Sequence, residues 1–180
     1  GLSADLSYAV YGFNSSGHKI TLSSPERTSD RASVVENSER LVSFVDTVGH
    51  EPWLRTTIRG LVGQEVDYGL LVVSAKDGVT ETTREHLGIL LAMDLSTIIA
   101  ITKTDLVSDQ TEDEVEIEIE KLVRGVDCTP LSVSRSGVES AISEASASVL
   151  PIVRTSAVSR DGLDELDTMF KQLPKRRGEK

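Results

Sequence analysis

The sequence predicts an α/β protein with a parallel sheet covered by helices. Three nearly continuous apolar runs, at 68–73, 97–101 and 150–154, are typical of strands that are buried on both faces of such a sheet. Segments with apolar residues at helical spacing lie between them. This alternation favours right-handed crossovers, and ligands of such sheets bind at the carboxyl ends of the strands.

Six strands are expected in all. The first alternates between apolar and polar residues and ends at the turn signal N-S-S-G. The second ends at an aspartate, and the fifth is short. The expected strands are at 8–13, 41–45, 68–73, 97–101, 131–133 and 150–154.

Four helices are expected from the spacing of apolar residues. The third places Val115, Ile119 and Leu122 inside, and its many acidic residues are expected on a solvated face. Two polar segments, 15–38 and 134–148, are expected to be surface loops, the second with a short helix. The expected helices are at 54–62, 80–93, 111–123 and 161–173.

Composition limits the classes of function. The chain has 180 residues, 38% of them hydrophobic, which suits one domain with an adequate core. Its charge of -10 disfavours DNA or RNA binding driven by phosphate neutralisation, but not RNA contact through attached partners. No run approaches the roughly 18 apolar residues of a membrane span. The single cysteine, Cys128, is expected to be a half-buried apolar residue, and it permits a cytoplasmic location.

Short polar motifs follow three of the expected strands: D-T-V-G-H at 46–50, T-K-T-D at 102–105 and T-S-A-V at 155–158. Each motif alone is weak evidence, because each also fits an ordinary turn. A GTP-binding domain has the elements D-x-x-G, T-K-x-D and S-A in this order. Their order and their placement after strands therefore favour a guanine-nucleotide site.

The chemistry of guanine explains the residue types in the second and third motifs. The base presents two donors, N1–H and the N2 amine, and the Asp105 carboxylate can accept from both. Such bonds contribute roughly 1.5–3 kcal/mol each, and adenine offers no equivalent pair. The aliphatic stem of Lys103 can lie over the ring. The Ala157 N–H can donate to guanine O6, in a loop that Ser156 supports and Val158 ends.

The first motif suits the phosphate end of a nucleotide. Asp46, at the carboxyl end of a strand, can hold a divalent ion through water. Gly49 allows the backbone N–H to approach a phosphate closely. The simpler alternative is a strand-to-helix turn with Asp46 as a cap.

Together the motifs resemble a translational GTPase of the elongation factor Tu class. The segments D-T-V-G-H-E, T-T-I-R-G, K-D-G-V-T-E-T-T-R-E-H-L-G-I-L-L-A-M and T-K-T-D carry the resemblance over most of residues 40–173. His50 stands where signalling GTPases usually have glutamine. Four features resemble the branch of GTP-binding proteins 1 and 2, including archaeal relatives. Asp67 falls two residues later than in elongation factor Tu itself, and Thr102 stands in place of the usual asparagine. The other two features are R-E-H-L-G at 84–88 and Y-G-F at 11–13.

The resemblance implies a three-layer G domain of the P-loop GTPase type at residues 1–174. It also implies GTP or GDP and Mg²⁺ as cofactors, with Asp46 on the magnesium side and Gly49 N–H at the γ-phosphate. His50 would orient the attacking water when a ribosome-like partner turns it inward. Ser3 would match the magnesium-binding threonine of the family's switch I; the alternative is a terminus without this role.

Two family features are missing from the sequence. No G-x-x-x-x-G-K-[ST] phosphate-binding loop occurs, so the fold is expected to lack that loop and the first, central strand. Residues 175–180 would begin a linker to a missing β-barrel domain, and the ribosome and tRNA or another RNA would be reached through missing domains. The chain alone is therefore expected to be inactive. The alternative is a binding or regulatory module on a GTPase fold that does not hydrolyse nucleotide.

Overall fold

The chain forms two structural units, residues 1–64 and 65–180. The computed structural model describes residues 7–22, 28–47 and 66–175. The helix expected at 54–62 lies outside these residues. None of the described helices combines the length and the apolar composition that a membrane crossing requires.

The first unit contains a three-stranded antiparallel sheet in the order β2-β1-β3. Strand β1 (Ser7–Phe13) pairs along its whole length with β3 (Arg40–Asp46), and the short strand β2 (Lys19–Ile20) pairs with the end of β1. The strands expected at 8–13 and 41–45 are therefore present, but they run antiparallel to each other. The alternating sequence of β1 explains this, because alternation suits a sheet with one buried face rather than a parallel core.

An aromatic cluster and one helix complete the first unit. The Tyr11 ring stacks on Phe44 with centroids 5.9 Å apart and meets the edge of Phe13 at 5.5 Å. Helix α1 (Thr28–Asn37) buries Val34. The prediction of a surface loop over 15–38 was wrong for α1 and β2, because the helix has too few apolar residues to show a clear period.

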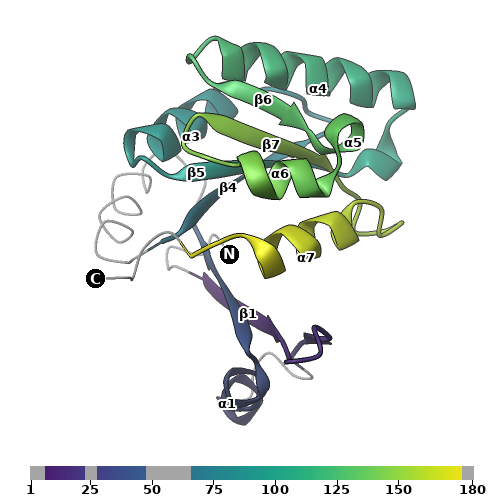
Figure 1. Cartoon of the computed structure of the whole chain (residues 1–180). Helices are drawn as coiled ribbons and strands as arrows, with labels where there is room; N and C mark the ends of the chain where they lie inside the picture. The colour runs from purple at the N-terminus through teal and green to yellow at the C-terminus, as the bar shows by residue number, and fades with distance from the viewer. Residues whose placement is uncertain (1–6, 23–27, 48–65, 176–180) are drawn as a thin grey trace. The chain divides into compact units, whose positions relative to one another are not determined.

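The second unit is a four-stranded parallel sheet in the order β4-β5-β7-β6 (Figure 1). All four strands were expected from the sequence, and β3 and β4 belong to different sheets, with no described strand joining them. The strands are β4 (Tyr68–Ser74), β5 (Ser96–Thr102), β6 (Thr129–Ser132) and β7 (Val149–Arg154).

Helices cover both faces of the parallel sheet (Figure 1), which confirms the three-layer α/β fold. One face carries α3 (Glu81–Ala92) and α4 (Asp109–Arg124). Apolar residues of these helices pack on the strands, and Cys128 lies half-buried beside them. The other face carries α5 (Val133–Ser136), α6 (Val138–Glu144) and α7 (Leu163–Gln172). The segment expected as a loop at 134–148 thus contains most of two short helices.

Polar side chains start the two long helices on the first face. Thr80 and Thr83 form a reciprocal capping box at the start of α3. The Ser108 hydroxyl accepts from the Thr111 N–H, 3.2 Å away, at the start of α4. Both bonds satisfy backbone donors that the first helical turn leaves without partners.

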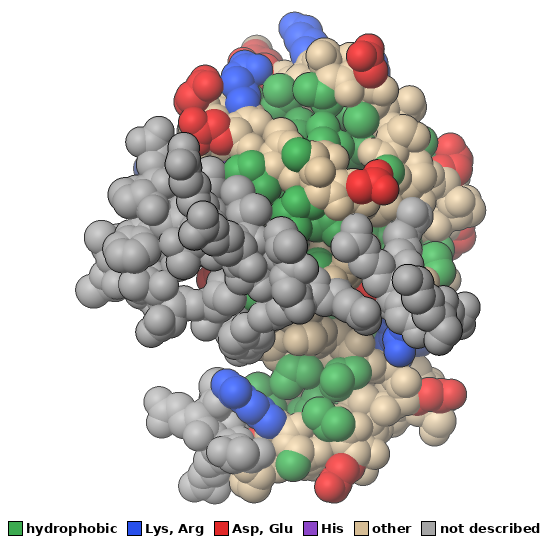
Figure 2. All heavy atoms as spheres, turned by 90° about the vertical axis from the view of Figure 1, so that its left-hand side faces the viewer, with side chains coloured by type: hydrophobic (Ala, Val, Ile, Leu, Met, Phe, Trp, Pro, Cys, Tyr) green, Lys and Arg blue, Asp and Glu red, His purple; other side chains and the backbone are tan. Residues whose placement is uncertain are grey.

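The acidic face of α4 is not wholly solvated, contrary to the prediction. Glu116 and Glu120 are only 2% and 8% exposed. They lie beside the buried stripe that contains Val115 and Ile119, and arginines outside the helix pair with them. Figure 2 shows other acidic side chains scattered singly or in small groups over the visible face.

Candidate functional site

Two loops meet at the carboxyl ends of β5 and β7. These strands are neighbours, and Ile101 of β5 is in register with Arg154 of β7. The Thr155 N–H and hydroxyl both donate to the Ile101 carbonyl, at 2.7 and 2.9 Å. The Thr104 hydroxyl donates to the Thr155 carbonyl at 3.1 Å. The motifs T-K-T-D and T-S-A-V are therefore tied together by direct hydrogen bonds.

Ser156 is the central polar residue of this junction. It is fully buried, and its hydroxyl donates to Asp105 Oδ1 at 2.5 Å. The same hydroxyl oxygen accepts from the backbone N–H groups of Val158 and Ser159, each at 3.1 Å. One serine thus orients the carboxylate of the first loop and shapes the second.

Asp105 itself remains open to a ligand. The residue is exposed, and among the described residues its second oxygen, Oδ2, has no hydrogen-bond partner. A carboxylate that is oriented through one oxygen and open at the other can accept from a neighbouring pair of donors. The edge of guanine presents such a pair.

Lys103 and Ala157 belong to the same two motifs as Asp105 and Ser156. Lys103 is exposed and adopts a left-handed backbone conformation, with φ 60° and ψ 35°, at the start of the short helix η1 (Thr104–Leu106). Ala157 is exposed, and its N–H has no partner within the part of the chain that the structure describes. The two loops thus offer an unsatisfied backbone donor and a long, exposed side chain, in the same motifs as Asp105 and Ser156. Val158 is 81% exposed at the rim.

The second loop closes on Gly162, which has a positive φ of 69°. The Ser156 N–H donates to the Asp161 carbonyl at 3.0 Å, which brings the chain back towards β7. A Cβ atom at position 162 would lie 1.8 Å from the Arg154 carbonyl oxygen. No residue with a side chain fits there without displacing the backbone.

The phosphate-side candidates belong to the first unit. Asp46 is the exposed last residue of β3, paired with Ser7 of β1. Ser3, Gly49 and His50 lie outside the described residues. No group of three or more His, Cys, Asp or Glu side chains that could hold a metal occurs within residues 7–22, 28–47 and 66–175.

Sequence reasoning did not assign roles to three residues that build the site. Thr104 and Thr155 each lie within a motif, but the hydrogen bond between them depends on the pairing of β5 with β7. Gly162 follows Asp161 as an ordinary turn pair, and its close approach to Arg154 carries no local signal. For Thr104 and Thr155, the place of each residue within a motif was the available clue.

Comparison with known proteins identifies the family. The sequence model of the "Elongation factor Tu GTP binding domain" matches residues 18–175. GTP-binding protein 2 of Mus musculus is 33% identical over 97% of this chain. The selenocysteine-specific elongation factor of Escherichia coli K12 is 34% identical over 76% of it. The chain spans only 29% and 19% of these two relatives.

A solved structure shares the fold. The translation elongation factor SelB of Methanococcus maripaludis, in complex with the GTP analogue GPPNHP, superposes with a TM-score of 0.57. It is 23% identical, and the match covers 79% of this chain and 27% of that one. The expected resemblance to translational GTPases and to GTP-binding protein 2 is therefore confirmed. Because the family model covers most of its length, the chain belongs to the elongation factor Tu GTP-binding domain family.

Proposed function

We propose that this chain is the guanine-reading part of a GTPase that acts in translation. The observation that carries the proposal is the Ser156–Asp105 hydrogen bond, which joins the T-S-A-V and T-K-T-D loops around an open carboxylate oxygen. Asp105 accepts from guanine N1–H and N2, and Ala157 N–H donates to O6. Lys103 covers one face of the ring, Val158 lies at the rim, and Thr102 leads the chain from β5 into the site.

Binding and hydrolysis at the phosphate end involve the first unit and are part of the same proposal. Carboxylate and hydroxyl oxygens are the ligands that Mg²⁺ prefers, so Asp46 and Ser3 suit it chemically. The bound ion would neutralise charge on the phosphates. Gly49 N–H contacts the γ-phosphate, and His50 orients the attacking water. Catalysis is then chiefly positioning and charge stabilisation.

The wider setting is inferred from the names of relatives, several of which are elongation or initiation factors. We infer a G domain at 1–174 and the start of a linker at 175–180. The ribosome and tRNA or another RNA are the expected partners, and the cytoplasm is the expected location. Alone, the chain should bind GTP weakly, because it has no phosphate-binding loop to hold the most charged part of the ligand. Calorimetry that gave sub-micromolar binding to the isolated chain would contradict this expectation.

The central test is a change of base specificity in the intact protein. Asp105→Asn should lose GTP and gain xanthosine triphosphate (XTP), because xanthine replaces the N2 donor with a carbonyl acceptor to which an amide can donate. Competition between GTP and XTP measures the change. Asp94→Asn is the matched control, since Asp94 is exposed and lies before β5, away from the site. Unchanged GTP preference in Asp105→Asn would remove Asp105 from the site.

A further inference from the structure

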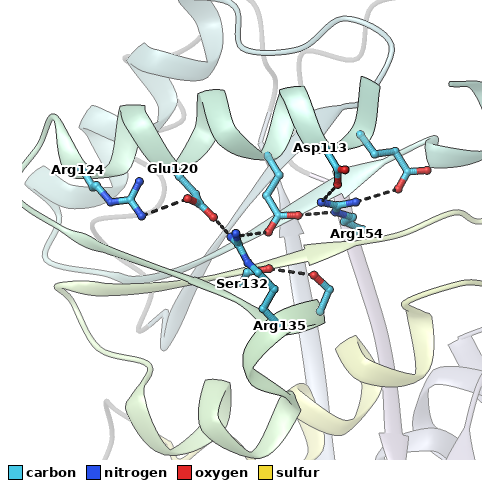
Figure 3. Close-up of polar contacts among 9 residues, drawn as sticks. Asp113, Glu120, Arg124, Ser132, Arg135 and Arg154 are labelled. Carbon is cyan, nitrogen blue, oxygen red and sulfur yellow. Dashed lines mark hydrogen bonds and ion pairs between the residues drawn. The ribbon is translucent and has the colours of Figure 1, made fainter. Parts of the chain in front are cut away.

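Two buried glutamates on α4 pair with arginines from other elements (Figure 3). Glu116 and Glu120 are one helical turn apart and share the inward side of the helix. A buried carboxylate is costly unless it is paired and hydrogen-bonded. The identity of each arginine partner therefore shows what each glutamate holds in place.

Glu116 holds Arg154, the last residue of β7. Arg154 Nε donates to Glu116 Oε2. The other guanidinium nitrogens of Arg154 meet two more acids of the same helix, Asp113 at 2.7 Å and Glu112 at 3.6 Å. All three nitrogens of one arginine are thus engaged by a single helix. Burial alone would lower the pKa of Arg154, but the bonds and charges of Asp113 and Glu116 outweigh it and raise the pKa.

Glu120 holds a different part of the fold. Its carboxylate pairs with Arg135 of α5 and with Arg124 at the end of α4, the latter at 3.1 Å. Arg135 also reaches Glu116 at 3.4 Å. Glu120 therefore ties α4 to α5, near the outer strand β6, and within the described residues it has no hydrogen bond or ion pair with β7.

Arg154 directly precedes the loop that contains Ser156 and Ala157. Its main chain is in register with Ile101, where β5 leads into T-K-T-D. Its carbonyl lies against Gly162, where the same loop closes. The side chain of Arg154 is held by α4 while its backbone supports both ends of the loop at 155–161. A shift of Arg154 would therefore move the loop that presents Ala157 N–H and Ser156.

We propose that the Glu116–Arg154 ion pair is a positioning device for base recognition, which fixes loop 155–161 in the geometry that binds guanine. The proposal rests on the proposed function, since it assigns the base site to this loop. Glu116 and Arg154 are positioning residues, because they act through the loop without touching the base. Glu120 has similar burial and the same charge but belongs to the α5 side of the network.

A comparison of Glu116 variants with Glu120 variants supplies a matched test in the intact protein. Glu116→Gln and Glu120→Gln each remove one buried charge from the same helix. Arg154→Lys keeps the positive charge but loses the planar guanidinium fork, whose three separate nitrogens each meet a different acid. Two quantities are measured for each variant: the GDP dissociation constant, and amide hydrogen exchange of residues 156–161 without nucleotide.

We expect Glu116→Gln and Arg154→Lys to weaken GDP binding about tenfold, which is about 1.4 kcal/mol. Loop amides should exchange at least fivefold faster in both. Glu120→Gln should change GDP binding less than twofold and leave loop exchange unaltered. Equal losses in Glu116→Gln and Glu120→Gln would show general destabilisation of α4 and overturn the proposal, as would unaltered loop exchange in Glu116→Gln. Absence of GDP binding by the wild type would refute the proposed function. Faster loop exchange in Glu116→Gln would then show that the ion pair holds the loop, and its role in base recognition would be overturned.

Discussion

Replacing Ser156 by alanine should separate the ordering of the site from its charge. The substitution removes one oxygen from a fully buried side chain and leaves Asp105 in place. That oxygen makes three bonds: it donates to Asp105 and accepts from two backbone N–H groups. After the change, Asp105 keeps its charge but loses the partner that orients it, and the loop loses its internal acceptor.

The size of the effect follows from the three bonds. A hydrogen bond to a charged group contributes roughly 1.5–3 kcal/mol, and the lower end applies because Asp105 is exposed. Val158 and Ser159 are also exposed, so water can replace the serine at their N–H groups at a cost of about 0.5 kcal/mol in all. We therefore expect the free energy of GDP binding to become less favourable by about 2 kcal/mol, which is a roughly thirtyfold rise in the dissociation constant.

Equilibrium binding of GDP and of ADP to the intact protein measures this effect. Guanine preference should fall with affinity, because ADP makes no use of the oriented carboxylate. Ser159→Ala is the control in the same loop, since the Ser159 hydroxyl donates to Asp161 and not to Asp105. It should stay within about threefold of wild type. Wild-type GDP affinity in Ser156→Ala would refute the view that this serine organises the site.

Four further outcomes are expected. Gly162→Ala should lower the free energy of unfolding by about 2–4 kcal/mol in urea titrations, because its Cβ would overlap the Arg154 carbonyl. Lys103→Gly should raise that free energy by up to about 1 kcal/mol and yet weaken GDP binding, since it relieves a left-handed backbone while removing the side chain that we propose to cover the base. Burial raises the pKa of Glu112 above 4.5, so its charge opposes folding. Glu112→Gln should therefore match wild-type stability below about pH 4.5 and exceed it increasingly as the pH rises through the raised pKa in pH-dependent unfolding. In the full-length protein, His50→Ala should leave GTP affinity within about threefold but slow ribosome-stimulated single-turnover hydrolysis at least about a hundredfold, and equal stimulated rates would exclude the role of His50.

The parallel sheet could be predicted because its strands are buried on both faces. Strands β4, β5 and β7 have almost no polar interruption, and few other structures accommodate such runs. Polar motifs directly after β5 and β7 then place candidate ligands at one edge of the sheet. The proximity of Asp105 and Ser156 follows from this topology, although the hydrogen bond between their side chains does not follow from the sequence.

Other features depend on contacts that the sequence pattern does not encode. Glu116 and Glu120 look like two more acids on an acidic helix, and only the positions of Arg154 and Arg135 show that they are buried in pairs. The clue was their spacing of four residues, immediately beside the apolar stripe at Val115 and Ile119. Helix α1 was not predicted for a similar reason. Val34 is the one buried side chain among those described for this helix, so its apolar residues show no helical period.

The backbone of Lys103 is locally strained, and hydrogen bonds of neighbouring residues hold it in that conformation. A non-glycine residue in the left-handed region costs about 1–2 kcal/mol, and glycine would avoid most of that cost. The neighbouring contacts outweigh the strain: the Thr104 hydroxyl and N–H both point to the Thr155 carbonyl, and Asp105 accepts from Ser156. These bonds require the chain to turn sharply at position 103, whatever residue stands there. In the proposed function, the side chain of this lysine covers the planar base whose edge meets the open carboxylate of Asp105. The strain is thus local, and the bonds that hold it in place are the same ones that orient Asp105.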